Sequence, residues 1–260
     1  MPADEIRIRG LRGIPEVQPG TNLANEILSA LRSTGIPARR DETSVERESP
    51  IVFVVAQKVV SKSEGRLLRL DGVVPSPRAQ AWASEHHKDP RMVEAVLQQA
   101  RRIVRMDRGV LIVETCHGFI CANAGVDASN APSGTVVLLP GDPDQSSDRL
   151  RQELESALQR RVGVIISDTF GRPWRKGLTN VALGVSGLSP FIDYRGQVDS
   201  YGRSLRATVI AVADELAGAA ELVMGKTAAI PVVVIEGFQC SCMEGSGRDL
   251  IRPPEEDLFR

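Results

Sequence analysis

Runs of apolar residues, separated by glycine, proline and polar clusters, divide this chain into predicted strands and helices. Short apolar runs rich in β-branched residues predict strands at residues 6–12, 51–55, 110–113, 135–139, 162–166, 181–186 and 231–235. Apolar residues that recur every three or four positions predict helices, which we place from Thr21 or Asn22 through Leu31 and at residues 91–105, 147–161 and 205–224. The chain is therefore expected to contain both kinds of element.

The segments between these elements are mostly polar. Residues 35–49 are charged and read as a solvated connection, and residues 189–203 read as a polar, glycine-containing loop. Residues 71–90 read as a long loop or a domain connection, in which His86 and His87 are expected to be solvated rather than catalytic. The predicted helix 205–224 is apolar nearly all round, so it should be buried, and a partner chain is one candidate for covering it.

Composition narrows the class of protein. The chain has 260 residues, 42% of them hydrophobic and 25% charged, as in ordinary globular proteins, and its net charge is −1. A balanced charge gives no field that would favour nucleic acid or an anionic membrane. No apolar run approaches the roughly 18–20 residues of a spanning helix, and the N-terminal residues have no signal-peptide core. We therefore expect a cytoplasmic protein with neither nucleic acid nor membrane as a partner.

The four cysteines do not have the spacing of a zinc site. Cys116 and Cys121 are five residues apart, Cys240 and Cys242 are two apart, and His117 is the only histidine near them. We interpret all four as reduced, partly buried thiols. A redox or metal role for Cys240 and Cys242 stays open.

The most informative stretch is residues 162–180. The strand is predicted to stop at Ser167-Asp168-Thr169, a cluster of oxygen ligands, and a basic loop with Arg172, Arg175 and Lys176 follows. A carboxylate and a hydroxyl beside fixed positive charge could hold a divalent cation and the phosphates that it bridges. A surface loop after a core strand explains the same residues equally well.

A second oxygen-rich segment follows the strand predicted at 110–113. Asp127 and Asn130 lie there among glycines and alanines, which would let a ligand approach the backbone, although an Asx-type turn is an equal alternative. Two carboxylates brought together are costly unless a cation neutralises them. The combined pattern therefore favours a metal-dependent, phosphate-handling site over either loop taken alone.

Other catalytic patterns are absent from the sequence. Met224-Gly225-Lys226-Thr227 is like the end of a Walker A motif, but Ala220 occupies the position of the required glycine and a helix precedes it, so a standard P-loop is rejected. No G-x-S-x-G motif and no plausible Cys/His pair supports nucleophilic catalysis.

Five runs together resemble the coenzyme F-420:L-glutamate ligase family, also called F-420-0:gamma-glutamyl ligase. They are VVSKSEGR at 59–66, NAGVDASN at 123–130, ISDTFGR at 166–172, YGR at 201–203 and VADE at 212–215. The resemblance covers essentially the whole chain in one order. It implies a mixed α/β (α+β) fold of the two-domain glutamyl-ligase type in an intertwined homodimer. Residues 1–260 would form the ligase domain, with two possible subdomains of uncertain boundary and no C-terminal nitroreductase-like domain.

The resemblance also implies the activity. Such an enzyme uses GTP and a divalent cation, Mg²⁺ or Mn²⁺ and possibly also K⁺, to attach L-glutamate to the deazaflavin precursor F-420-0, and then a further gamma-linked glutamate. The γ-phosphate would first pass to the precursor's carboxylate to make an acyl phosphate, which the amine of glutamate would then attack. No general base is singled out, and neither the number of glutamates, the metal used in the cell nor the residues that bind the precursor can be read from the sequence.

The family's functional positions map onto this chain by motif. The metal ligands would be Asp127, Asp168 and Thr169, and phosphate or substrate contacts could come from Arg172, Lys176, Tyr201 and Arg203. The nucleotide contacts would be Ile14, Pro15, Glu16, Val17, Gln57, Lys62, Asn130, Met224, Gly225, Lys226 and Thr227. Arg172, Arg175 and Lys176 could face the triphosphate, the precursor's phosphodiester or solvent.

Two departures from the family pattern affect the nucleotide site. Gln57-Lys58 replaces the expected Ser-Thr or Ser-Lys pair, and the segment from Lys226 to Ala229 is shorter and less glycine-rich than in some relatives. Both departures leave the metal ligands intact, but they leave open whether the enzyme uses GTP or another nucleotide. Two other classes of protein would also fit: a regulator that binds GTP and metal without catalysis, or a structural dimerisation module.

Overall fold

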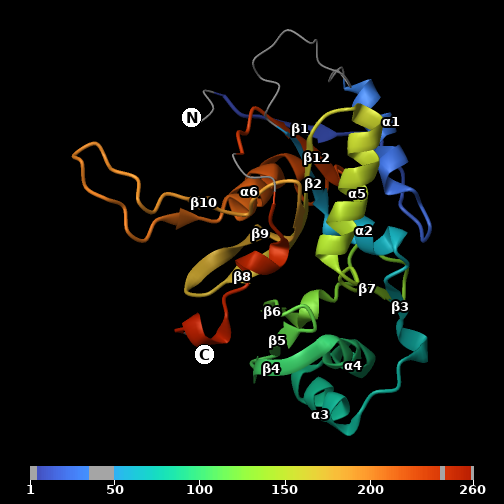
Figure 1. The fold of residues 1–260 in the computed structure, drawn as a ribbon. Helices are drawn as coiled ribbons and strands as arrows, with labels where there is room; N and C mark the ends of the chain where they lie inside the picture. Colours follow the sequence, from blue (N-terminus) through green and yellow to red (C-terminus); the bar gives the residue numbers. More distant parts are fainter. Residues whose placement is uncertain (1–4, 35–49, 241–243, 259–260) are drawn as a thin grey trace.

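The computed structural model describes residues 5–34, 50–240 and 244–258. It confirms the mixed α/β class, because several sheets and helices share the chain. The prediction for residues 35–49 falls outside the described residues, as does Cys242. The elements fall into two groups with separate cores, one above the other in Figure 1.

The first group is built on a five-stranded sheet in the order β1-β12-β2-β8-β9. Only β2 and β8 run parallel; every other neighbouring pair is antiparallel. The strands are β1 (Arg7–Leu11), β12 (Val232–Glu236), β2 (Ile51–Ala56), β8 (Val162–Arg172) and β9 (Arg175–Ser186). The apolar run of β2 is buried on both faces, as helices on either side of a sheet require.

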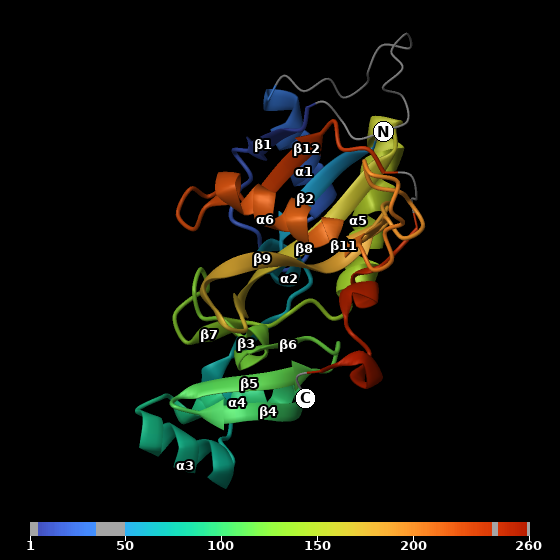
Figure 2. The ribbon, with the colours of Figure 1, turned by 90° about the vertical axis from the view of Figure 1, so that its left-hand side faces the viewer.

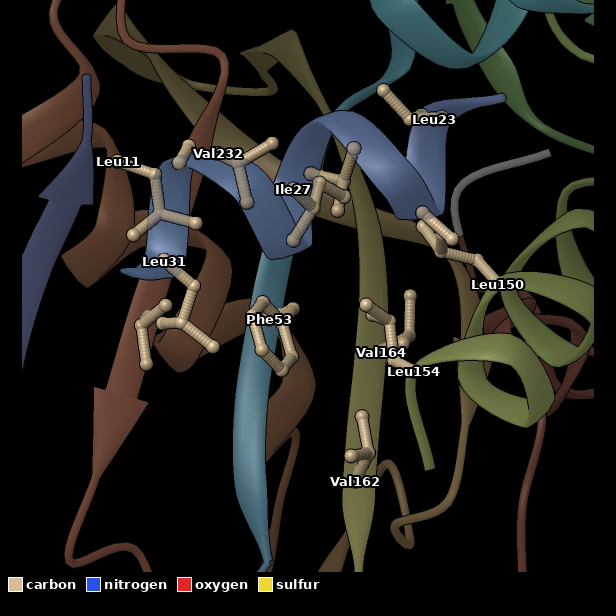
Figure 3. Close-up of a cluster of buried hydrophobic side chains, with 14 of the residues drawn as sticks. Leu11, Leu23, Ile27, Leu31, Phe53, Leu150, Leu154, Val162, Val164 and Val232 are labelled. Carbon is tan, nitrogen blue, oxygen red and sulfur yellow. The ribbon is translucent and has the colours of Figure 1, made fainter. Parts of the chain in front are cut away.

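Helices cover both faces of this sheet. α1 (Leu23–Ser33), capped by Asn22, and α5 (Pro143–Leu158), capped by Asp142, pack on one face. Figure 3 shows Ile27 of α1 near Phe53 of β2 and Leu154 of α5 beside Val164 of β8, in one buried cluster. α6 (Val212–Met224) packs on the other face, in front of the sheet in Figure 2.

α5 approaches β9 closely because β9 has a glycine at the point of contact. A Cβ on Gly184 would lie 2.1 Å from the carbonyl oxygen of Pro143, the first residue of α5. Any side chain at this position would therefore push the helix away from the sheet.

The second group lies beyond the carboxyl end of β2. The chain passes through α2 (Gln57–Ser63) and β3 (Leu67–Arg69), which pairs with β7 (Thr135–Val137). The short helix η2 (Leu70–Gly72) follows, and α3 (Pro77–His86) and α4 (Pro90–Gln99) pack with the β4-β5-β6 sheet around a core of their own. These strands are β4 (Ala100–Asp107), β5 (Val110–Thr115) and β6 (Ile120–Ala122), and η3 (Asn123–Gly125) follows them.

The remaining elements are short. β10 (Ile192–Asp193) pairs with β11 (Val209–Ile210) at the base of an arm that projects from the first group in Figure 1. Near the C-terminus, η4 (Gly247–Leu250) follows an N-cap at Ser246, and η5 (Pro254–Glu256) follows Pro253.

Several sequence-based element predictions were wrong. The predicted helix 91–105 ends at Gln99, because residues from Ala100 onward pair with β5 and become strand β4. The predicted loop 71–90 contains α3, which Ser76 caps and Pro77 begins; serine at the N-cap and proline in the first turn are both signals of a helix start. The predicted helix 205–224 begins only at Val212, because the residues before it return from the arm and form β11.

The most consequential correction concerns the stretch 162–180. The strand does not stop at Ser167 but continues as β8 to Arg172, because β9 pairs with it through Asp168, Thr169 and beyond. The expected basic loop is therefore the tip of a long hairpin. Asp168 and Thr169 lie on paired backbone, which holds their side chains more rigidly than a loop would.

Candidate functional site

Two segments carry the predicted metal ligands to one place. Asp168 and Thr169 lie on β8, one and two residues beyond the pair that Ser167 forms with Ala56 of β2. Asp127 follows η3 and is held by two backbone hydrogen bonds with Val137 of β7, of 3.1 and 2.8 Å. Electrostatic interactions between the two carboxylates show that the fold brings them together: Asp127 contributes to the shift of the Asp168 pKa.

Asp168 is poorly solvated. Burial, and to a smaller extent the neighbouring charge of Asp127, raise the pKa of its carboxyl to about 6, although the backbone amide of Thr169 and the ammonium groups of Lys58 and Lys226 act against that rise. A partly buried carboxylate beside a second carboxylate is the arrangement that a bound cation stabilises.

Asp127 has direct hydrogen-bond and ion-pair partners. Its carboxylate accepts hydrogen bonds from the backbone amide and hydroxyl of Ser129, of 2.7 and 2.8 Å, and forms a 2.5 Å ion pair with the Nζ atom of Lys58. Although burial alone would raise it, the pKa of Asp127 is held below its usual value by Lys58 and Ser129. The sequence had suggested Lys58 only as a departure from the family pattern, and the structure makes it the cationic neighbour of Asp127.

Thr169 belongs to a hydrogen-bond network that ties β8 to α6. Its Oγ1 donates to Oδ1 of Asn180 at 2.6 Å and accepts from Nζ of Lys226 at 2.5 Å. Glu221 of α6 closes the network, with one oxygen 3.1 Å from Nδ2 of Asn180 and the other 2.8 Å from Nζ of Lys226. Asn180 is buried, so this network fixes the position of the Thr169 hydroxyl.

Asn180 and Glu221 were not among the predicted site residues. Asn180 is the register partner of Thr169 on β9, eleven positions away in the chain, and Glu221 lies on a helix packed against that strand. Strand pairing brings Asn180 to the site and helix packing brings Glu221, so no local sequence signal could have identified them.

Two of the predicted nucleotide-contacting segments contact each other. Lys62 of α2 is almost completely buried, and its Nζ lies 2.5 Å from a carboxylate oxygen of Glu16. The amide of Gly20 donates to the carbonyl of Ser63, so the segment with Ile14, Pro15, Glu16 and Val17 lies against α2. Val17 is buried in the core and Ile14 packs against it, so their side chains have a structural role.

Two buried polar atoms near the end of β2 have no partner among the described residues. They are Nε2 of Gln57 and Oγ of Ser167. Oε1 of Gln57 accepts a 3.0 Å hydrogen bond from Ser61, which orients the amide. Unsatisfied buried polar atoms are uncommon in folded proteins. Here Ser167 directly precedes Asp168, and Gln57 directly follows Ala56, the register partner of Ser167.

The other predicted contacts are more exposed. Asn130 lies in a turn after Asp127 with a φ of 56°, and Gly225, Lys226 and Thr227 follow the C-terminus of α6, where Met224 is buried. Arg172 and Lys176 lie at the hairpin tip. Tyr201 and Arg203 lie in the arm, which Figure 1 shows pointing away from the rest of this chain. Within one chain, the structure does not bring Tyr201 and Arg203 to Asp127 and Asp168.

The ligand set suits a hard divalent cation rather than zinc. Residues 5–34, 50–240 and 244–258 contain no group of three or more His, Cys, Asp or Glu side chains that could hold a metal ion by themselves. Asp127, Asp168 and the Thr169 hydroxyl would supply only part of a coordination shell, as is usual for Mg²⁺ bound together with substrate phosphates. The described cysteines are free thiols, as expected, and burial raises the pKa of Cys121 to about 12.

Comparison with known proteins shows the family of this chain. The family model described as F420-0:Gamma-glutamyl ligase matches residues 12–237. This chain belongs to the F420-0:gamma-glutamyl ligase family. The coenzyme F420:L-glutamate ligase of Methanothermobacter thermautotrophicus is 43% identical over 98% of this chain and 99% of its own length. The proteins of the same name from Methanocaldococcus jannaschii and Methanopyrus kandleri are 46% and 44% identical, over 80% and 94% of this chain and 84% and 94% of their own lengths.

Family membership confirms the resemblance identified from the sequence motifs. The matched region includes every predicted metal ligand and nucleotide contact as well as the network residues Asn180 and Glu221. In the described part of the chain, no helix combines the length and apolarity needed to cross a membrane.

Proposed function

We propose that this protein is a coenzyme F-420:L-glutamate ligase that uses GTP and a divalent cation to join L-glutamate to F-420-0. The observation that carries the proposal is the pairing of Asp168 with Asp127, surrounded by the ammonium groups of Lys58 and Lys226. The relatives' names support the reaction. This chain matches two proteins named coenzyme F420:L-glutamate ligase over nearly their whole lengths.

Asp127, Asp168 and Thr169 would hold the cation, Mg²⁺ or Mn²⁺. When bound, it supplies positive charge to the β- and γ-phosphate oxygens. The residues present fit this role, since the raised pKa of Asp168 reflects a desolvated carboxylate that no side chain in the described residues contacts by an ion pair or hydrogen bond.

Three lysines would position the phosphates. Lys58, Lys62 and Lys226 come from the start of α2, its last turn and the loop after α6, and each contacts an oxygen of the site or of the adjoining Glu16 segment. An ammonium group held near a phosphate stabilises negative charge that develops during transfer. The unpartnered amide of Gln57 is oriented to donate a further hydrogen bond to a ligand.

The reaction follows from the need to activate a carboxylate. An oxygen of the F-420-0 carboxylate would form a bond to the γ-phosphorus of GTP, while the bond to the β-phosphate oxygen breaks and GDP leaves. The amine nitrogen of glutamate would then attack the carbonyl carbon of this acyl phosphate. Phosphate leaves with the bonding electrons, the nitrogen loses a proton, and an amide results. Addition of a second, gamma-linked glutamate would repeat the same two steps.

A homodimer is part of this proposal. The arm between β10 and β11 projects from the chain with Tyr201 87% exposed, which suits contact with a second copy. Contact by the arm with a second copy could bring Tyr201 and Arg203 of one chain to the site around Asp127 and Asp168 of the other.

The decisive experiment is mass spectrometry of F-420-0 incubated with the protein, GTP, Mg²⁺ and L-glutamate. We expect one fixed mass increase for each glutamate added, with one GTP converted to GDP and phosphate for each step. ATP in place of GTP tests the nucleotide choice that Gln57-Lys58 leaves open. Binding of GTP and metal without any glutamylated product would instead identify a regulator.

A further inference from the structure

The tip of the β8–β9 hairpin carries an exposed tryptophan in an unusual backbone conformation. Arg172 pairs with Arg175, so Pro173 and Trp174 alone form the turn. Trp174 has a φ of 57°, in the left-handed region, and 79% of its surface is exposed. A proline followed by a residue with positive φ is typical of a type II turn, where that second position usually holds glycine. A bulky aromatic residue there is a genuine outlier.

Most of the surface of Trp174 stays exposed in this chain. Tryptophan normally buries most of its surface, and the side chain would be expected in a core or an interface. The backbone of the hairpin tip is braced, because Nη2 of Arg172 donates a 2.7 Å hydrogen bond to the carbonyl of Lys176, and Gly177 supplies a second positive φ of 87°. The hairpin thus presents an aromatic face on a fixed support.

The charged residues that flank Trp174 along the hairpin tip are all basic. Arg172, Arg175 and Lys176 are exposed, and none of them forms an ion pair with an acidic side chain in the described residues. An exposed aromatic ring bordered by unpaired cations complements a ligand that is itself aromatic and anionic.

The tip is also within reach of the reacting groups. Trp174 is six residues beyond Asp168 on the same hairpin, which limits their Cα separation to about 20 Å. Figures 1 and 2 show the hairpin extending beyond the main sheet towards the group that contains β4, β5 and β6. A ligand bound at the tip could therefore extend along the hairpin to the carboxylates.

We propose that Trp174 stacks on the deazaflavin ring of the precursor and that Arg175 and Lys176 bind its phosphodiester. This inference rests on the proposed function, because the precursor is the aromatic and anionic substrate of that reaction. Its carboxylate would then point back along the hairpin towards Asp168, where the nucleotide is activated. Trp174 is thus a specificity-determining residue for the precursor, separate from the metal and nucleotide contacts.

The test uses the small number of tryptophans in the chain. Trp82 and Trp174 are the only two, and Trp82 lies in α3 in the second group of elements, with its ring tilted against that of His86. In a Trp82→Phe protein all tryptophan fluorescence comes from Trp174, and F-420-0 without GTP should quench it saturably, after correction for absorption by the ligand. The matched Trp174→Phe protein should show no saturable quenching. A 5-deazariboflavin without the phosphodiester should quench Trp174 at a higher concentration than F-420-0 does.

Steady-state kinetics provide the second readout. We expect Trp174→Ala to raise the KM for F-420-0 about 10-fold or more and to leave the KM for GTP unchanged, since aromatic stacking contributes on this scale. Trp174→Phe, which keeps an aromatic ring, should stay within about threefold of the wild type.

If the wild type makes product but the KM for F-420-0 is unchanged in the Trp174→Ala protein, the inference about Trp174 is overturned. The proposed function would still stand. A wild-type protein that makes no glutamylated product would overturn both. If Trp174→Ala instead converts a dimer to a monomer in analytical ultracentrifugation without changing that KM, the ring contacts a second copy of the chain.

Discussion

The Nζ atom of Lys58 lies 2.5 Å from Oδ2 of Asp127, so an ammonium group sits against one of the two carboxylates that would hold the metal. Asp168, the other carboxylate, has no ion-pair partner among the described residues and keeps a raised pKa. The protein therefore pairs one carboxylate of the site directly with a lysine, whereas the other has only the longer-range attraction of Lys58 and Lys226.

Replacing Lys58 with methionine should strengthen metal binding to the nucleotide-free protein. The substitution removes a positive charge that repels the incoming cation, and two unit charges about 4 Å apart in water interact by about 1 kcal/mol. We expect Mn²⁺ affinity, measured by electron paramagnetic resonance, to rise several-fold while GTP affinity falls. Lys176→Met removes the same charge at the distant hairpin tip and should leave Mn²⁺ affinity unchanged. Equal or weaker Mn²⁺ binding by Lys58→Met would show that Asp127 does not bind the metal.

Asp168→Asn should lower turnover by roughly 10²-fold or more, the scale of losing one preorganised electrostatic contact. The amide is similar in size but cannot supply the negative charge that holds a divalent cation. Product formation at saturating Mg²⁺ is the measurement, and Asp71→Asn, which changes an exposed carboxylate paired with Arg69, is the control. Near-normal turnover at saturating Mg²⁺ would remove Asp168 from the metal site.

The raised pKa of Asp168 also predicts a pH dependence of stability in the metal-free protein. Because its pKa is about 6 in the folded state and near 4 in the unfolded chain, folding favours the protonated form. The contribution to the free energy of unfolding is full below about pH 4 and is lost as the pH rises to about 6. At pH 7.5 in EDTA, Asp168→Asn should therefore be more stable than wild type by about 1–2 kcal/mol, after discounting for solvent.

Urea unfolding at pH 4.5 and pH 7.5 would measure this effect. The difference between variant and wild type should be larger at the higher pH. A variant that is less stable than wild type at pH 7.5 would mean that the charged carboxylate is compensated in the folded protein.

The network between Thr169, Asn180 and Glu221 should show energetic coupling. Asn180→Ala leaves the Thr169 hydroxyl and a Glu221 oxygen without their partner, and because Asn180 is buried we expect a loss of about 1–3 kcal/mol of stability. Combining it with Glu221→Gln should cost less than the sum of the single changes, since both act on one network. Asn180→Ala combined with the distant Gln80→Ala should be additive, and additivity in the network pair as well would contradict the coupling.

The sequence alone predicted many of the buried strands and several of the candidate site residues. Apolar runs identified the buried strands of the main sheet, because a strand covered on both faces must be apolar throughout, as residues 51–55 are. Motifs identified Asp127, Asp168, Thr169 and Lys62, and the family match confirmed the resemblance on which their roles rest. The element errors arose where tertiary pairing overrode local preference, as when residues after Gln99 became β4 by pairing with β5.

What only the tertiary structure decided is which side chains share a site. Strand pairing placed Asn180 beside Thr169, the start of α2 placed Lys58 against Asp127, and the continuation of β8 turned an expected loop into a rigid hairpin with Trp174 at its tip. Local sequence encodes periodicity and turn chemistry. Hydrogen bonds between strands and ion pairs join residues far apart in the chain, so the chemistry of the site is determined by contacts that no local pattern records.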